Sequence, residues 1–356
     1  MQAKSNRPAG NPERATGGAV RPVGAWIRTL PKTELHIHAE AIMSPSSYAA
    51  LHTRYRDIIA PGLPETYPEL SRRGPLSDMI RRFLLLQDLL RTSGDYALLA
   101  TDMRRYAEAN DIRYMEVFVS PSRPLKSGLI DFAGIMDPLS EKAGPDIAFI
   151  IDLSRSFGPE NAASNLDATL KYIARHGSAP IVGVGLGGRE TGNPVAPYSG
   201  TFARAREAGL HAVAHAGEET GPESVRDAVL LLGAERIGHG TSAIRDPAVM
   251  DLLRERNITL EVCPTSNVYT GAFVGSYEEH PLPAFRDAGL AITVNSDDPA
   301  LFGIDLDREL ELVATKLGFS RTDILALLRT AIQSSFMPAA RKKKELARLD
   351  SRGSAS

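Results

Sequence analysis

Eight short apolar segments that alternate with helical segments are the feature of this sequence that most restricts its fold. The apolar segments are rich in Ile, Val and Ala, and helical periodicity lies between them. Strands that alternate with helices form βα units with parallel pairing, and eight units over about 300 residues predict a closed (β/α)₈ TIM barrel. The expected strands are Leu35–Ala39, Arg113–Val119, Ile147–Leu153, Ile181–Leu186, Ala212–His215, Arg236–Gly238, Thr259–Val262 and Ala291–Val294.

An open, doubly wound sheet is the alternative fold for the same alternation. It lacks support, because no G-x-G-x-x-G motif follows the first strand. A glycine cluster at the fourth strand has a spacing that fits no phosphate-binding loop; it consists of Gly183, Gly185, Gly187 and Gly188. The barrel is therefore the preferred fold.

The sequence predicts one folded domain with a tail at each end. Residues 1–23 are rich in Pro, Gly, Asn and Arg and contain no apolar run, so we expect a disordered tail and not a signal peptide. Residues 24–345 form the barrel. Within them, residues 45–110 are too long for a simple βα connection and predict a helical lid after the first strand. Residues 346–356 are expected to be a second disordered tail.

Composition excludes several classes of partner. The net charge of -2 over 356 residues argues against nucleic acid, whose binding proteins carry a basic excess. No apolar run is long enough to predict a membrane span. The only cysteine, Cys263, excludes an internal disulfide and a cysteine-rich zinc site. We expect a cytoplasmic protein with a small-molecule partner.

Two histidines stand one residue apart on the first expected strand. Side chains alternate between the faces of a strand, so His36 and His38 point the same way. The pair can supply half of a metal site, or it can lie on a solvated strand face. The rest of the sequence has to decide between these interpretations.

Further polar residues stand where later strands end. His215 ends the fifth strand, His239 ends the sixth, and Asp297 and Asp298 follow the eighth. The carboxyl ends of barrel strands converge on one face, where active sites of this fold are found. A single buried histidine is usually structural, but this convergence favours a catalytic metal site.

The predicted ligands are nitrogen and oxygen donors: His36, His38, His215 and Asp297. This donor set predicts one divalent metal ion per chain, and a hydrolytic site favours Zn²⁺, although Fe²⁺, Mn²⁺ and Co²⁺ suit the same donors. The metal would activate a water molecule. His239 is available to orient or deprotonate that water, and Glu218 is placed to protonate the substrate. The alternative for Glu218 is a surface-loop carboxylate beside Glu219.

Five segments together resemble the adenosine/adenine deaminase family of the amidohydrolase superfamily, from about residue 28 to residue 345. They occur in the order found in the family. The segments are Leu30-Pro-Lys-Thr-Glu-Leu-His-Ile-His38, His215-Ala-Gly-Glu218, Arg236-Ile-Gly-His-Gly240, Glu261-Val-Cys-Pro-Thr-Ser-Asn267 and Asn295-Ser-Asp-Asp-Pro299.

The resemblance implies a zinc-containing (β/α)₈ barrel that hydrolyses the 6-amino group of purines to a 6-oxo group with release of ammonia. It implies that Glu218 protonates ring N1 and that His239 positions and deprotonates the water. Asp298 would hydrogen-bond N7, and the backbone N–H of Gly188 would meet N3. The metal ligands implied by the family are the same four residues named above.

The sequence departs from the family pattern beside the first strand. Adenosine deaminases usually read H-x-H-L-D-G there, and this chain reads His38-Ala39-Glu40-Ala41. A glutamate at this position resembles adenine deaminases, so Glu40 is a candidate substrate-binding residue. The fourth-strand segment also carries Gly185 and Arg189 where an aspartate is usual. We expect intact deamination chemistry and an altered sugar-side pocket.

Three hypotheses follow for function. The first is deamination of a purine nucleoside or base, with adenosine or a close analogue preferred and adenine as the alternative. The second is another amidohydrolase reaction, such as deamination of a pterin or pyrimidine-like ring. The third is a nucleoside-binding barrel without activity, which the complete catalytic set disfavours. The oligomeric state is left open.

Overall fold

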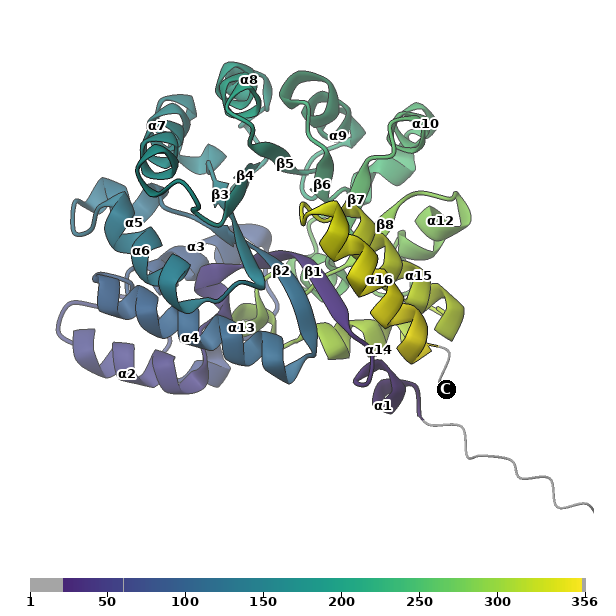
Figure 1. Ribbon diagram of the computed structural model, residues 1–356, viewed down its shortest axis with the longest axis horizontal. Helices are drawn as coiled ribbons and strands as arrows, with labels where there is room; N and C mark the ends of the chain where they lie inside the picture. Colours follow the sequence, from purple (N-terminus) through teal and green to yellow (C-terminus); the bar gives the residue numbers. More distant parts are fainter. Residues whose placement is uncertain (1–21, 60, 354–356) are drawn as a thin grey trace, which may run out of the picture.

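The computed structural model describes residues 22–59 and 61–353, and it contains eight parallel strands arranged as a barrel (Figure 1). Neighbouring strands pair in sequence order from β1 to β8. The fold is thus a (β/α)₈ TIM barrel, as predicted. The strands are β1 (Lys32–His38), β2 (Ile112–Val119), β3 (Ile147–Asp152), β4 (Ile181–Leu186), β5 (His211–Ala216), β6 (Arg236–His239), β7 (Thr259–Val262) and β8 (Ile292–Val294).

The seam between β8 and β1 is closed by residues just beyond the short strand β8. The backbone N–H of His38 donates to the carbonyl of Asp297 at 2.9 Å, and the N–H of Asp297 donates to the carbonyl of His36 at 3.1 Å. The side-chain oxygen of Asn295 accepts from the N–H groups of Leu35 and His36 at 3.0 and 3.2 Å. An amide side chain thus replaces backbone acceptors that β8 does not provide.

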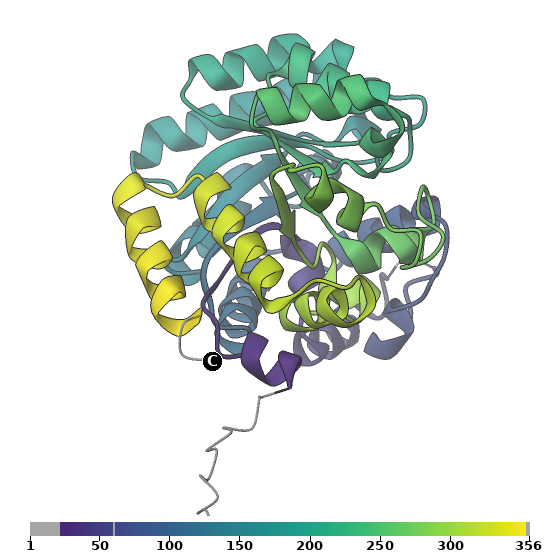
Figure 2. The ribbon, with the colours of Figure 1, turned by 90° about the vertical axis from the view of Figure 1, so that its right-hand side faces the viewer.

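Helices surround the barrel, and short ones follow several strand ends (Figures 1 and 2). None of those in residues 22–59 and 61–353 combines the length and apolar character that crossing a membrane requires. The helices of the first half are α1 (Val23–Ile27), α2 (Pro45–Tyr55), α3 (Leu76–Gln87), α4 (Ser93–Ala109), α5 (Ser122–Ser127), α6 (Phe132–Lys142), α7 (Pro159–His176) and α8 (Ser199–Glu207). Those of the second half are α9 (Pro222–Asp227), α10 (Pro247–Glu255), α11 (Pro264–Thr270), α12 (Leu282–Asp287), α13 (Pro299–Phe302), α14 (Leu306–Lys316), α15 (Arg321–Ser334) and α16 (Ala339–Gly353).

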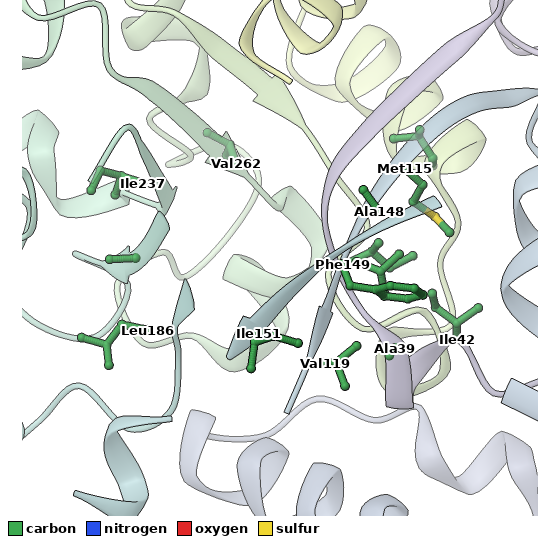
Figure 3. Close-up of a cluster of buried hydrophobic side chains, with 14 of the residues drawn as sticks. Ala39, Ile42, Met115, Val119, Ala148, Phe149, Ile151, Leu186, Ile237 and Val262 are labelled. Carbon is green, nitrogen blue, oxygen red and sulfur yellow. The ribbon is translucent and has the colours of Figure 1, made fainter. Parts of the chain in front are cut away.

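Buried apolar side chains separate into two clusters that follow the alternation of the strands. On β3, Phe149 and Ile151 belong to the large cluster that also contains helix residues such as Phe202 (Figure 3). Ile150, between them, packs instead with Phe118 and Val213 in a small separate cluster. Successive strand residues point to opposite faces, so the large cluster lies between sheet and helices and the small one lies inside the barrel.

The insertion at residues 45–110 contains helices α2, α3 and α4. Helix α3 contributes the apolar side chains of Leu76, Met79 and Phe83 to a cavity at the carboxyl end of the strands. The insertion therefore lies against the expected active-site face. Its action as a moving lid stays a prediction.

The C-terminal tail predicted for residues 346–356 is wrong up to Gly353, because helix α16 continues to that residue. Leu349 is 1% exposed and belongs to the main apolar cluster, and Leu346 packs against it one turn earlier. The basic residues of this segment concealed an apolar stripe at helical spacing. Figure 2 shows α16 beside α15. Of the predicted N-terminal tail, residues 1–21 lie outside the described part, and Val23 begins helix α1.

Truncation of Leu349 tests whether α16 is part of the fold. We expect Leu349→Ala to lower the free energy of unfolding by about 2–5 kcal/mol, because it leaves a cavity in the main core. Urea denaturation measures the change. The exposed Lys343→Ala on the same helix is the control and should change stability by about 0.5 kcal/mol or less. Equal stability of the two variants would show that α16 does not pack as described.

Candidate active site

The carboxyl ends of β1, β5 and β8 bring the predicted metal ligands together. His38 Nε2 lies 3.2 Å from His215 Nε2 and 3.4 Å from Asp297 Oδ1. His36 Nε2 lies 3.5 Å from the same carboxylate oxygen. All four side chains are buried. The fold thus joins residues from opposite ends of the chain at one point.

These separations fit the coordination of a metal ion. Four ligand atoms about 2.1 Å from one ion, at the corners of a tetrahedron, lie about 3.4 Å apart. His36 Nε2 is buried and has no hydrogen-bond partner in the protein, so it is left free to coordinate. Possible ligand atoms form two overlapping clusters in the described residues: one contains His36, His215, His239 and Asp297, all within 4.8 Å of one another, and the other contains His38, Asp297 and Asp298. The donor set therefore fits a divalent cation.

The acidic residues around His36 and His38 favour a positive charge at the metal position. Burial lowers the pKa of His36, but the nearby carboxylates of Asp297 and Glu261 outweigh burial and raise it to about 9. Burial also lowers the pKa of His38, and nearby Asp298 and Asp297 raise it to about 10. Burial raises the pKa of Asp297, yet the neighbouring imidazoles of His36 and His38 hold it well below its usual range. A bound cation would satisfy the same carboxylate.

A column of buried charges supports His36 from inside the barrel. His36 Nδ1 lies 2.8 Å from Glu261 Oε2, and the other oxygen of Glu261 accepts from Arg236 Nε at 2.5 Å. Arg236 also donates to Glu116 at 2.6 Å and stacks on Phe336 at 3.8 Å. The neighbouring Arg236 charge outweighs burial and lowers the pKa of Glu261, so the carboxylate holds His36 with Nδ1 protonated and Nε2 directed at the metal position.

The sequence analysis gave no role to Arg236 and Glu261. The available signal was the presence of charged residues within strands that are otherwise apolar and buried. Glu116 is fully buried and paired with Arg236, so its charge is neutralised inside the barrel.

Glu218 lies beside the metal position, on the loop after β5. Its Oε2 is 3.6 Å from His239 Nε2, and its side chain is buried, so a surface-loop interpretation is wrong. Burial and the nearby Asp297 raise the pKa of Glu218 well above its usual range. A carboxyl group whose pKa is raised holds its proton more tightly than usual, which suits the role of a general acid.

The loop that carries Glu218 is held by Glu190, which the sequence analysis missed. Its carboxylate accepts hydrogen bonds from the backbone N–H groups of Gly217 (2.7 Å), Glu218 (3.2 Å) and Glu219 (2.8 Å). Hydrogen bonds such as these, and the charge of Arg155, offset burial and lower the pKa of Glu190. An ionised carboxylate can accept several N–H groups at once, so Glu190 fixes the position of the acid.

His239 and Asp297 both adopt left-handed backbone conformations, each with φ near 61°. Such a conformation costs a residue with a β-carbon roughly 1–2 kcal/mol. His239 ends β6, and Asp297 lies three residues after the end of β8. The unusual turns direct the imidazole and the carboxylate into the site, a pattern typical of functional residues.

A cavity opens beside these residues and has walls of two kinds. One wall is apolar and comes from α3 and Phe157, and the other carries hydroxyl groups from Ser120, Ser154 and Ser156. Gly188 lines the cavity with φ 85°, and a β-carbon there would meet serine hydroxyls at 2.6–2.7 Å. Its backbone therefore stays accessible.

Asp298 lines the same cavity. Burial and the neighbouring Asp297 raise its pKa to about 8. A protonated carboxyl group at this position is able to donate a hydrogen bond to a ring nitrogen.

Glu40 is placed behind the cavity wall. Its Oε1 accepts from Gln87 Nε2 at 3.2 Å and from the backbone N–H of Ser120 at 3.0 Å. Gln87 and Ser120 line the cavity, whereas Glu40 is fully buried behind them. Glu40 can therefore affect the substrate through Gln87 and Ser120, and direct contact between Glu40 and the substrate stays a prediction.

A model of the adenosine deaminase family matches residues 31–352. The chain belongs to the adenosine deaminase family. It is 36% identical over 338 residues to an aminodeoxyfutalosine deaminase of Streptomyces avermitilis, covering 93% of each chain. It is also 35% identical to an adenine deaminase of Cupriavidus necator, covering 91% of this chain and 92% of the relative.

Solved structures agree with this assignment. The adenine deaminase of Arthrobacter aurescens matches with a TM-score of 0.83 and 31% identity, over 92% of this chain and all of the other. A more distant amidohydrolase from Burkhoderia ambifaria, solved with bound zinc, shares the fold with a TM-score of 0.81 at 23% identity. Members of the adenosine deaminase family are hydrolases of C–N bonds, and this chain is one of them.

Glu261→Gln tests the support of His36. We expect a 10–100-fold weaker affinity for zinc, because the neutral amide no longer stabilises the imidazole in its ligating orientation. Competition with a chromogenic chelator measures the affinity.

Glu309→Gln is the matched control for that experiment. Glu309 is a buried acid on α14 that accepts from the backbone of Thr265 at 3.0 Å, and its described hydrogen bonds reach none of the predicted ligands. Zinc affinity should be unchanged in this variant. Equal affinities of the two variants would contradict the role given to Glu261.

Proposed function

We propose that this enzyme hydrolyses the amino group from C6 of a purine, using one zinc ion held by His36, His38, His215 and Asp297. The observation that carries the proposal is the close approach of these buried donors, with His38 Nε2 3.2 Å from His215 Nε2 and 3.4 Å from Asp297 Oδ1, beside the buried carboxyl group of Glu218. When bound, zinc supplies Lewis acidity that activates a water molecule at neutral pH. The family membership supports the reaction class.

The protein side chains have complementary tasks in this reaction. Glu218 donates its proton to ring N1, which makes C6 more electrophilic. Asp298 has a raised pKa of about 8 and donates a hydrogen bond to N7. The accessible backbone N–H of Gly188 meets N3. A purine held at three ring nitrogens is oriented with C6 toward the metal position.

The cavity favours a base or a nucleoside over a nucleotide. Among the described residues that line it there is no Lys or Arg, whereas Asp152 adds a carboxylate. Phosphate recognition normally uses positively charged side chains or exposed helix N-termini. We therefore infer that the substrate carries no phosphate group.

Two substrate classes are favoured by different observations. Glu40, which replaces the aspartate of adenosine deaminases, favours adenine, the substrate named for the Cupriavidus relative. The apolar wall of α3 and the serine hydroxyls favour a larger adenine derivative, in line with the aminodeoxyfutalosine named for the Streptomyces relatives. Adenosine itself is the intermediate case.

A panel assay of ammonia release distinguishes these classes. The zinc-loaded protein is incubated with adenine, adenosine, 2′-deoxyadenosine, aminodeoxyfutalosine and AMP, with guanine and a pterin as unrelated rings. We expect turnover of at least one uncharged 6-aminopurine and none of AMP, because the cavity has no cation for phosphate. Turnover of the pterin alone, or of no compound, would contradict the proposed function.

Glu218→Gln tests the general acid. The amide keeps the size of the side chain but has no acidic proton, so we expect kcat to fall about 10²–10⁴-fold with zinc content unchanged. Steady-state kinetics and metal analysis of the purified variant measure both properties. The adjacent Glu219→Gln is the matched control and should stay within about 3-fold of the starting enzyme. Near-normal activity of Glu218→Gln would rule out the assigned role.

A further inference from the structure

A chain of hydrogen bonds reaches His239 from the side opposite the metal position. The backbone N–H of Leu282 donates to His280 Nδ1 at 3.1 Å. His280 Nε2 lies 3.4 Å from Asn267 Oδ1, and Asn267 Nδ2 lies 3.1 Å from His239 Nδ1. Asn267, His280 and His239 are each no more than 4% exposed. Neither Asn267 nor His280 has a role in the reaction described above.

The first hydrogen bond, from the Leu282 N–H to His280, determines the donor and the acceptor of every later hydrogen bond in this series. A backbone N–H can only donate, so Nδ1 of His280 accepts and carries no proton. The proton of His280 is then on Nε2, where it is donated to Asn267 Oδ1. The amide nitrogen of Asn267 consequently faces Nδ1 of His239, which must accept. The single proton of His239 therefore resides on Nε2.

We propose that Asn267 and His280 are positioning residues that hold His239 as the Nε2–H tautomer. This proposal rests on the proposed function, because His239 faces Glu218 and Asp297, between which the reaction is proposed to occur. Its Nε2 lies 3.6 Å from Glu218 Oε2 and 4.0 Å from Asp297 Oδ2. His239 thus presents an N–H donor to the site. It orients the attacking water and does not take the proton from it, in contrast to the role implied by family resemblance.

The opposite tautomer is disfavoured by the same geometry. It would require Asn267 to turn its oxygen toward His239 and its NH₂ group toward the protonated Nε2 of His280. Two donors would then face each other in a buried place. Moving the proton of His280 to Nδ1 would remove the acceptor of the Leu282 N–H. Each alternative leaves a buried donor without a partner.

The proton of the attacking water is then taken by Glu218. Its carboxylate becomes free once it has protonated N1, so it accepts one proton while the water oxygen bonds to C6. Glu218 passes this proton to the amino nitrogen, which leaves as ammonia with the electron pair of the C6–N bond. The remaining hydroxyl proton returns to Glu218, giving the 6-oxo product and restoring the acid.

Nitrogen-15 NMR of the zinc-loaded enzyme tests the tautomer directly. Long-range correlations between imidazole protons and nitrogens distinguish a protonated ring nitrogen from an unprotonated one. We expect His239 to show a protonated Nε2 and an unprotonated Nδ1, and His280 to show the same pattern. A protonated Nδ1 on His239 would overturn the proposal. The measurement does not depend on turnover, so failure of the purine panel and failure of this inference are distinguishable.

Asn267→Asp tests the consequence for catalysis. The carboxylate has the shape of the amide but can only accept, so His239 should donate from Nδ1 and lose the proton on Nε2. We expect exchanged NMR patterns for the two nitrogens and a kcat lower by about 10²-fold or more, with KM changed less than about 3-fold. An unchanged NMR pattern, or a normal kcat with an exchanged pattern, would overturn the proposal.

Asn110→Asp is the matched control for this substitution. Asn110 is also buried, but it lies at the start of β2 and bonds to Tyr106 and Asp307. The His239 pattern and kcat should be unchanged in this variant. If Asn267→Asp does not fold, the NMR pattern of the unsubstituted enzyme still decides the proposal.

Discussion

The position of Asp297 is the constraint on which the rest of this structure depends. Its backbone closes the barrel by pairing with His36 and His38 on β1, and its carboxylate lies within 3.5 Å of both imidazoles. The same residue therefore completes the fold and the candidate metal site. Because the seam sets the distance between β8 and β1, the geometry of the donors is a property of the closed barrel and not of a flexible loop.

The candidate site depends on charged side chains that are buried inside the barrel. Buried charges are costly unless they are paired, and here Arg236 lies between the carboxylates of Glu116 and Glu261. Glu261 in turn holds His36. A second network, through Asn267 and His280, reaches His239. Such networks contribute little net stability, but they fix ring orientations and proton positions that catalysis depends on.

Much of the fold and of the site could be predicted from sequence, and the errors have identifiable causes. Alternating apolar and helical segments predicted the barrel, and polar residues at strand ends predicted the donors that the structure brings together. The prediction of a C-terminal tail was wrong because basic residues concealed the apolar contact made by Leu349. Glu190 had no sequence signal of its own, since it acts through the backbone of a loop distant in the chain.

The sequence by itself determined the fold class, the family and the chemical types of the catalytic residues, because these depend on periodicity and on local motifs. The tertiary structure decided which groups support them. It placed Glu40 behind Gln87 and Ser120, since the turn after β1 buries this side chain. It also set the direction of the hydrogen bonds that reach His239. The first donor in that series is the backbone N–H of Leu282, which is distant from His239 in the sequence. Distances and proton positions arise only when the strands and loops are assembled.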